Sequence, residues 1–154
     1  MVRFQDFAID ATRNAVDELL RYAQAVPAER LSWRPSEQAR SVLEILQECA
    51  VMPLGIVEHL RDRPQAPRDI SGYFAQMAQL DAYEKCAQAL KANTETLIEA
   101  MRAVPESDLN QQVMMPWGLS YSLAQLMFLH YWNLTYHLGQ VAYIQLLYGD
   151  TNFY

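Results

Sequence analysis

The chain has 154 residues, of which 51% are hydrophobic and 19% charged, and its 12 basic and 18 acidic side chains give a net charge of −6. A chain of this length buries about 68–70% of its unfolded surface, which is enough for a hydrophobic core. Nucleic acids and anionic membranes bind concentrated Lys and Arg, so an acidic chain without a basic block is expected to bind neither. Residues 1–154 are predicted to form a single domain.

No stretch has the pattern of a targeting signal or a membrane span. The first ten residues carry three charged side chains in place of an apolar run. The most apolar stretch, residues 119–148, is interrupted by glutamine, histidine and asparagine, whereas a span needs about 20 predominantly apolar residues. Cys49 and Cys86 are far apart in sequence and are predicted to be buried and reduced. The expected compartment is the cytoplasm.

The first predicted helix runs from about Phe4 to Ala25. Its apolar residues recur at steps of three and four, as one buried face of a helix requires. Pro27 ends this helix, because the residue before a proline is disfavoured in the helical region. A loop is then expected to run as far as Arg40.

The second predicted helix begins after Ser41 and continues to Asp62. Ser41 and Glu44 have the spacing of a capping box, in which each side chain binds the backbone N–H of the other residue. Pro53 lies inside the helix and lacks a backbone donor, so a kink or local unwinding is expected near residues 49–52.

Two more helices are predicted in the second half of the chain. One is expected to run without interruption from about Ser71 to Ala103, where Val104-Pro105 stops it. The other begins at Ser120 or Ser122 and ends near Tyr148, before a glycine in the expected C-terminal position. No useful stretch alternates between apolar and polar residues, so no sheet is predicted. The expected fold class is all-α, a four-helix bundle.

The last predicted helix carries polar side chains on an otherwise apolar surface. His130, Asn133, His137 and Gln140 lie along one stripe, and Asn133 and His137 are one turn apart, so their side chains can converge. These groups could form a ligand site. They could equally hydrogen-bond to one another or to water inside the bundle.

Glu48 lies within an apolar part of the second predicted helix. A buried carboxylate has to be paired, hydrogen-bonded, metal-bound or protonated, because its desolvation is costly. The alternative is that Glu48 lies at the edge of a polar face together with Glu44. His59 is 11 residues further on, about 16 Å along a helix, so it cannot share an ion with Glu48. We expect His59 to be solvated or to cap the helix end.

The order of these features resembles the DinB-like (DinB/YfiT-type) family of small helical bundles. The Arg-Pro loop 31–35, followed by the Ser-Val-x-Glu start of residues 41–46, is similar to the family's approach to helix two. Residues 133–140, NLTYHLGQ, look like the family's HxxxHxGQ on the last helix. Residues 147–150, with Phe153, resemble the family's short glycine-bearing tail.

The resemblance implies a four-helix bundle with up-down-down-up helix order, and a homodimer. Many such proteins hold a divalent metal with three histidines, one on helix two and two on the last helix. These positions correspond to Glu48, Asn133 and His137, so one histidine of the three is retained. His130 is a further candidate ligand. The oxygen-rich set would suit Mn²⁺, Fe²⁺ or Mg²⁺ relatively better than Zn²⁺, and the candidate ions (Zn, Ni, Mn or Fe) are expected to bind weakly or not at all.

The resemblance implies a metal-dependent enzyme of the thiol-transferase, isomerase or hydrolase type that acts on a small molecule, here with an altered metal site. Glu48 and His137 would be ligands in that case, with His130 or Tyr136 as proton carriers. The alternative is a small-molecule-binding bundle without a metal, whose cleft lies among Trp117, Tyr121, Trp132 and Tyr136. In a third hypothesis the polar cluster only specifies the core of a scaffold.

Overall fold

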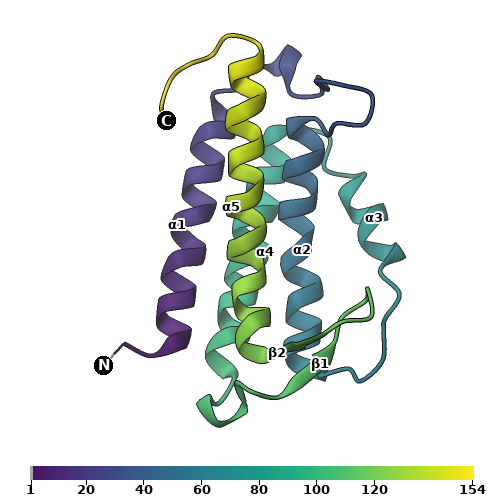
Figure 1. Ribbon diagram of the computed structural model, residues 1–154. Coiled ribbons are helices and arrows are strands. Elements are labelled where there is room, and N and C mark those ends of the chain that lie inside the picture. The colour runs from purple at the N-terminus through teal and green to yellow at the C-terminus, as the bar shows by residue number, and fades with distance from the viewer. Residues whose placement is uncertain (1) are drawn as a thin grey trace.

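The computed structural model describes residues 2–154 and contains four long helices with short elements between them (Figure 1). The long helices are α1 (Phe4–Gln24), α2 (Val42–Asp62), α4 (Tyr83–Ala103) and α5 (Leu123–Leu147). The short elements are α3 (Ser71–Met77), the 3₁₀ turns η1 (Ala28–Arg30) and η2 (Glu106–Asp108), and the strands β1 (Gln112–Met114) and β2 (Ser120–Ser122). The predicted all-α bundle is confirmed.

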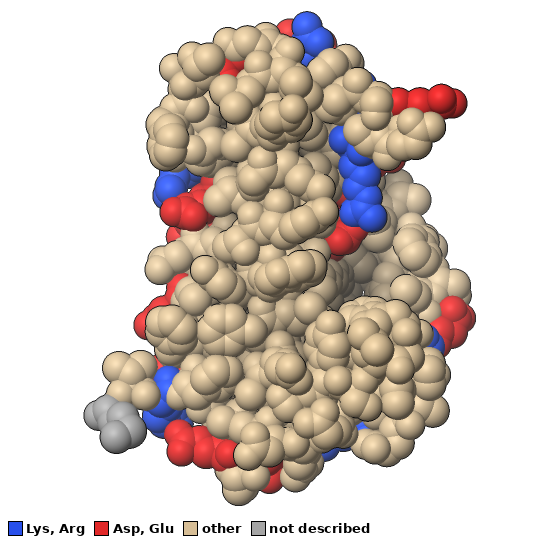
Figure 2. All heavy atoms as spheres, in the orientation of Figure 1, with Lys and Arg blue, Asp and Glu red and all other residues tan. Residues whose placement is uncertain are grey.

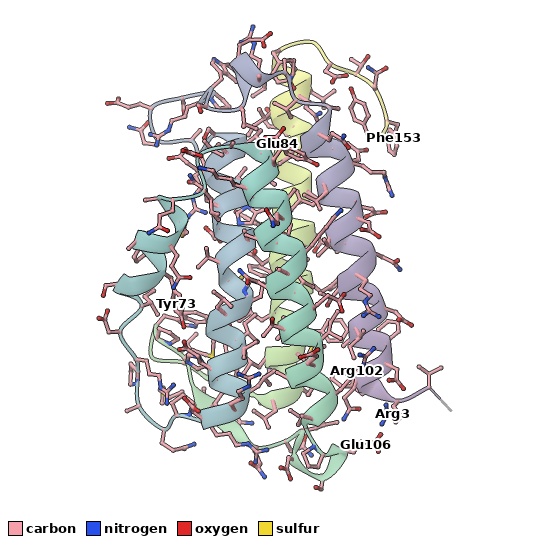
Figure 3. The ribbon with its side chains drawn as sticks, turned by 180° about the vertical axis from the view of Figure 1, so that it is seen from behind. Arg3, Tyr73, Glu84, Arg102, Glu106 and Phe153 are labelled. Carbon is pink, nitrogen blue, oxygen red and sulfur yellow. The ribbon has the colours of Figure 1, made fainter. Side chains whose placement is uncertain are left out.

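The four long helices form a bundle with up-down-down-up order. In Figure 1, α1 and α5 run upward while α2 and α4 run downward, and Figure 3 shows α4 descending from Glu84 to Arg102. Helix α5 packs between α1 and α2 on one side, and α4 contacts the same two helices on the other. The second and third long helices, α2 and α4, are therefore neighbours that run in the same direction, so the chain needs a long crossing connection, which contains α3.

Two apolar clusters follow one another along the bundle axis. Leu97, Met101 and Leu126 belong to the first cluster, and Leu46 and Leu90 belong to the second. A buried polar layer lies where the two clusters meet, formed by Thr12, Thr94 and His130. The Thr12 hydroxyl donates to the Ala8 carbonyl, and Thr94 hydrogen-bonds to His130. The layer thus satisfies much of its own polarity within the protein.

Capping boxes fix where α2 and α5 begin. Ser41 accepts from the backbone N–H of Glu44, whose carboxylate accepts from the Ser41 N–H, as predicted. Ser122 and Gln125 make the same reciprocal pair at the start of α5. Because α2 and α5 carry the candidate site residues, these caps set the register in which those residues face one another.

Two predictions of local structure were wrong, and of the kink or local unwinding expected before Pro53 the unwinding is absent. The helix predicted over residues 71–103 is two helices, α3 and α4, separated by residues 78–82. A two-stranded antiparallel hairpin, in which Val113 pairs with Tyr121, occupies the region expected to be a loop. Residues 49–52 are regular helix, so Pro53 causes no local unwinding there. Within residues 2–154, no helix has the length and hydropathy needed to cross a membrane.

Candidate functional site

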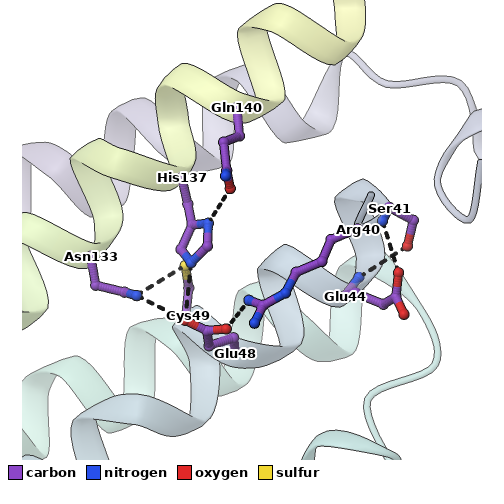
Figure 4. Close-up of polar contacts among 8 residues, drawn as sticks. All are labelled: Arg40, Ser41, Glu44, Glu48, Cys49, Asn133, His137 and Gln140. Carbon is purple, nitrogen blue, oxygen red and sulfur yellow. Dashed lines mark hydrogen bonds and ion pairs between the residues drawn. The ribbon is translucent and has the colours of Figure 1, made fainter. Parts of the chain in front are cut away.

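Glu48 lies on the face of α2 that is turned toward α5, and its side chain is 27% exposed. Its Oε1 atom lies 3.0 Å from Asn133 Nδ2, which donates to it, and 3.0 Å from His137 Nε2. Asn133 and His137 occupy successive turns of α5, so the one-turn spacing brings both side chains to the same carboxylate oxygen. Of the two alternatives for Glu48, the structure shows the partly buried, hydrogen-bonded one (Figure 4).

Arg40 pairs with the other carboxylate oxygen, Oε2, from the loop that precedes α2. Burial alone would raise the pKa of Glu48, but hydrogen bonds from His137 and Asn133 and the charge of Arg40 outweigh it and lower the pKa to about 2. Glu48 is therefore ionised at neutral pH. The role of Arg40 was missed from the sequence, although it lies only eight residues before Glu48.

The cluster continues behind these contacts. The Cys49 thiol donates to Asn133 Oδ1 over 3.5 Å, and burial raises the pKa of this thiol, so it keeps its proton. This bond fixes the Asn133 amide with its NH₂ group toward Glu48. On the far side of the imidazole, His137 Nδ1 lies 2.6 Å from Gln140 Oε1. Both ring nitrogens of His137 therefore lie within hydrogen-bonding distance of a side-chain oxygen, one from Glu48 and one from Gln140.

The residues at this site do not fit a resident divalent metal. Their polar atoms are close enough together to share an ion, but Glu48 already accepts from three donors, one of which is the cation Arg40. Asn133 turns its NH₂ group, not its oxygen, toward Glu48, and a neutral amide is a weak ligand. Among residues 2–154, no three His, Cys, Asp or Glu side chains are grouped so that they could hold a metal ion. A cluster of proton donors around one carboxylate is therefore the chemistry that these residues support.

The other two histidines lie away from this cluster. His130 is fully buried and its Nε2 atom lies 3.1 Å from the hydroxyl of Thr94 on α4. Burial lowers the pKa of His130 to about 3, so this ring is neutral at physiological pH. His59 was predicted to be solvated or capping, but it is 3% exposed and its Nδ1 atom bonds to the Gly55 carbonyl. That prediction was wrong because α3 and the β-hairpin cover this part of α2, which the sequence pattern did not indicate.

Two cavities meet at Glu48 and Arg40. The larger one is an open cleft of about 890 Å³ along α5, bordered by the loop before α2. Trp132 and Tyr136, which stack with ring centroids 5.5 Å apart, lie on its rim, and His137 and Gln140 line its wall. The smaller cavity, about 330 Å³, lies between α2, α3 and the hairpin turn. Glu48 and Arg40 line both.

The four aromatic residues predicted to share one cleft are divided by the structure. Trp132 and Tyr136 border the larger cleft, whereas Trp117 borders the smaller cavity and packs edge-on against Tyr121. Figure 2 shows that the surface over α5 is almost bare of Lys, Arg, Asp and Glu side chains. Indeed, α5 has no charged residue in its 25 positions, so the rim of the cleft is aromatic and uncharged apart from Arg40 and Glu48.

This bundle, with its site between the second and last long helices, belongs to a known class. Residues 8–141 match the DinB superfamily, so the chain belongs to that family. No curated protein sequence matches it significantly.

The solved structures with a similar fold include the following two. One is YfiT from Bacillus subtilis, described as a probable metal-dependent hydrolase with an unusual four-helix bundle topology. The TM-score is 0.77 with 10% identity, and the match covers 94% of this chain and 87% of YfiT. The other is a mycothiol-dependent maleylpyruvate isomerase, with a TM-score of 0.68 and 10% identity, covering 92% of this chain and 63% of the isomerase. At this identity the likeness shows the fold alone.

Proposed function

We propose that this DinB-superfamily protein binds a small organic molecule in the cleft along α5 without using a metal ion. The observation that supports the proposal is the saturation of Glu48, which accepts from Asn133 and His137 at one oxygen and pairs with Arg40 at the other. A charged cluster of this kind positions a polar group of a ligand, while the aromatic rim covers its apolar part.

The hydrogen bonds of the His137 ring favour a binding function over acid–base catalysis. A general base needs a ring nitrogen within reach of a substrate proton. Both nitrogens of His137 are already engaged, by Glu48 and by Gln140. The side chain is only 4% exposed, so a ligand meets its neighbours Gln140 and Arg40 more readily than the ring itself.

A metal-dependent enzyme is the second candidate function, because one solved structure of the same fold is described as a probable metal-dependent hydrolase. In that case Glu48, Asn133 and His137 would have to exchange their mutual hydrogen bonds for metal bonds. Bound metal would supply a Lewis acid or an activated water. The ions to be tested are Zn²⁺, Ni²⁺, Mn²⁺ and Fe²⁺.

Elemental analysis and calorimetric titration with these four ions separate the two candidates. We expect no stoichiometric metal in the purified protein and no heat of specific binding. The matched control is the double variant Glu48→His with Asn133→His, which rebuilds the three-histidine set found in many family members and should gain Zn²⁺ or Ni²⁺ affinity. Tight stoichiometric binding by the unaltered protein would overturn the metal-free proposal.

Binding in the cleft is tested with the fluorescent probe 1-anilinonaphthalene-8-sulfonate, which combines an aromatic body with an anionic group. The probe should bind the native protein with enhanced emission, and Tyr136→Ala or Gln140→Ala should weaken binding. Phe153→Ala is the control, because Phe153 is 97% exposed and does not border the cleft. Equal binding by all three variants and the unaltered protein would contradict a ligand site in the cleft.

A further inference from the structure

The smaller cavity has a largely apolar wall, to which His59 and Tyr73 add polar groups, and it ends at the cation Arg40. Its lining includes Val51, Met52, Ile56, Ile70, Phe74 and Met115, which supply aliphatic, thioether and aromatic surface. At the end where it meets the larger cleft, the wall changes to Arg40 and Glu48. A cavity of about 330 Å³ lies within the size range of small-molecule sites. The cavity could therefore hold an apolar chain whose polar end lies beside Arg40 and Glu48.

The guanidinium of Arg40 has more N–H donors than its contact with Glu48 uses. Arg40 donates to Glu48 through Nη1, whereas a guanidinium carries five N–H donors in a planar fork. The Arg40 side chain is 54% exposed, so the remaining donors are open to a ligand. Planar forks of this kind bind carboxylates in preference to neutral groups, because the bonds are charge-assisted.

If Arg40 also bound a second anion, Glu48 would still have hydrogen-bond donors. Its Oε1 atom would keep the hydrogen bonds from Asn133 and His137, each 3.0 Å long. A second carboxylate could therefore share the Arg40 guanidinium while Glu48 stays hydrogen-bonded.

We propose that the two cavities together hold an anionic amphiphile of the fatty-acid type. Its carboxylate lies against Arg40 in the larger cleft, and its alkyl chain extends into the smaller cavity beneath α3. The inference rests on the proposed function, since it names the ligand class for the same cleft. Methionine side chains, here Met52, Met77 and Met115, adapt well to an unbranched chain because they are flexible and polarisable.

Helix α3 supplies the route by which a chain would enter. None of its seven residues is buried, and it packs on α2. Tyr73 holds it there: its ring lies over Gly55, where an added Cβ would be 3.3 Å away, and its hydroxyl donates to Glu58 over 2.7 Å. In Figure 3 the labelled Tyr73 lies at α3, beside α2. An element held by so few contacts opens at low cost.

Calorimetric titration with decanoate, below its micelle-forming concentration, tests the proposal. Decan-1-ol, decyltrimethylammonium and butanoate serve as neutral, cationic and short-chain comparisons. Decanoate should bind more tightly than all three. Arg40→Gln should weaken decanoate binding about 10- to 100-fold, the loss expected for a charge-assisted hydrogen bond. Arg61→Gln, an exposed arginine on α2 outside both cavities, should leave it unchanged.

Two further variants test the position of the tail. Met52→Trp on α2 and Met77→Trp on α3 each fill the smaller cavity from a different side, and both should abolish decanoate binding; circular dichroism checks that they are folded. If decan-1-ol binds as tightly as decanoate, or if Arg40→Gln has no effect, the inference is wrong. The proposed function stands independently of that result as long as anilinonaphthalene sulfonate binding still depends on Tyr136 and Gln140.

Discussion

At the scale of single residues, Glu48 is the centre of the site because its carboxylate joins α2, α5 and the loop before α2. Asn133 and His137 reach it from α5, and Arg40 reaches it from the loop. All of these contacts favour the charged form of Glu48, which is why its pKa is lowered to about 2 despite burial. Protonation of this one group would therefore weaken every contact at once.

Replacing Glu48 with glutamine should change how stability depends on pH. The pKa of Glu48 falls from 4.5 to about 2 on folding, so its contribution is fully present above pH 4.5 and is lost as the pH falls toward about 2. The difference in unfolding free energy between the unaltered protein and Glu48→Gln should shrink over this range, as measured by urea denaturation. Glu99→Gln, on the exposed face of α4, is the control. A difference independent of pH would contradict the account.

The buried pair of Thr94 and His130 makes a second prediction. Thr94→Val leaves the imidazole without its hydroxyl partner and should cost about 1–3 kcal/mol, because an unsatisfied buried group is expensive. Adding His130→Leu removes both partners and should restore most of this loss. Denaturant unfolding of the single and double variants measures the difference. Equal destabilisation by the two variants would show that the hydrogen bond is not what matters.

The same pair adds a pH dependence of its own. Burial lowers the pKa of His130 from 6.5 to about 3, so between these values the unfolded chain binds a proton that the folded chain does not. Stability is therefore lost as the pH falls from 6.5 toward 3. The double variant of Thr94 and His130 should lack this component.

The residues of the site could be predicted better than their bonds. The one-turn spacing of Asn133 and His137, together with Glu48 in an apolar stretch, indicated where polar side chains would meet. The sequence could not give the orientation of the Asn133 amide, which depends on its contact with Cys49. It also gave no reason to select Arg40, because a loop arginine has no periodicity and its partner is known only once the loop is folded.

Among the elements, α3 has no buried residue, unlike the four long helices, and Gly55 allows its contact with α2. A Cβ at position 55 would lie 3.3 Å from the Tyr73 ring, whereas one at Gly139 in α5 would meet nothing within 4 Å. Gly139→Ala should therefore gain about 0.5–1 kcal/mol from helix propensity. Gly55→Ala should gain less and should speed amide exchange in residues 71–77, as measured by hydrogen–deuterium exchange. Unchanged exchange there would mean that Tyr73 does not hold α3.

The long helices were predictable because each has an apolar face and identifiable end signals, such as the boxes at Ser41 and Ser122. The break at residues 78–82 was not, since the stretch contains neither proline nor glycine and the break depends on tertiary contacts. One such contact is the Leu80 carbonyl, which accepts from Gln47 of α2. The strands of the hairpin have three residues each, too few for an alternating pattern to be recognised.

At the scale of the whole molecule, α5 is an uncharged helix with one face open to solvent. Tyr143 and Leu146 are 62% and 54% exposed. Exposed apolar side chains grouped on one helix commonly mark an interface between subunits. A homodimer is also expected from the family resemblance. We predict a dimer in size-exclusion chromatography with light scattering, and Leu146→Glu should shift it toward the monomer. The control is Phe74→Glu on α3, and a monomeric unaltered protein would refute the prediction.

We propose that protons, and not a metal ion, hold Glu48, Asn133 and His137 together. Nitrogen-15 NMR of the histidine rings separates the two cases, because a hydrogen-bonded imidazole N–H and a metal-bound nitrogen have distinct shifts. We predict that His137 keeps a proton on Nε2, and that this signal is unchanged when excess Zn²⁺ is added. Loss of the Nε2 proton on addition of stoichiometric Zn²⁺, with a shift to the metal-bound range, would contradict the account.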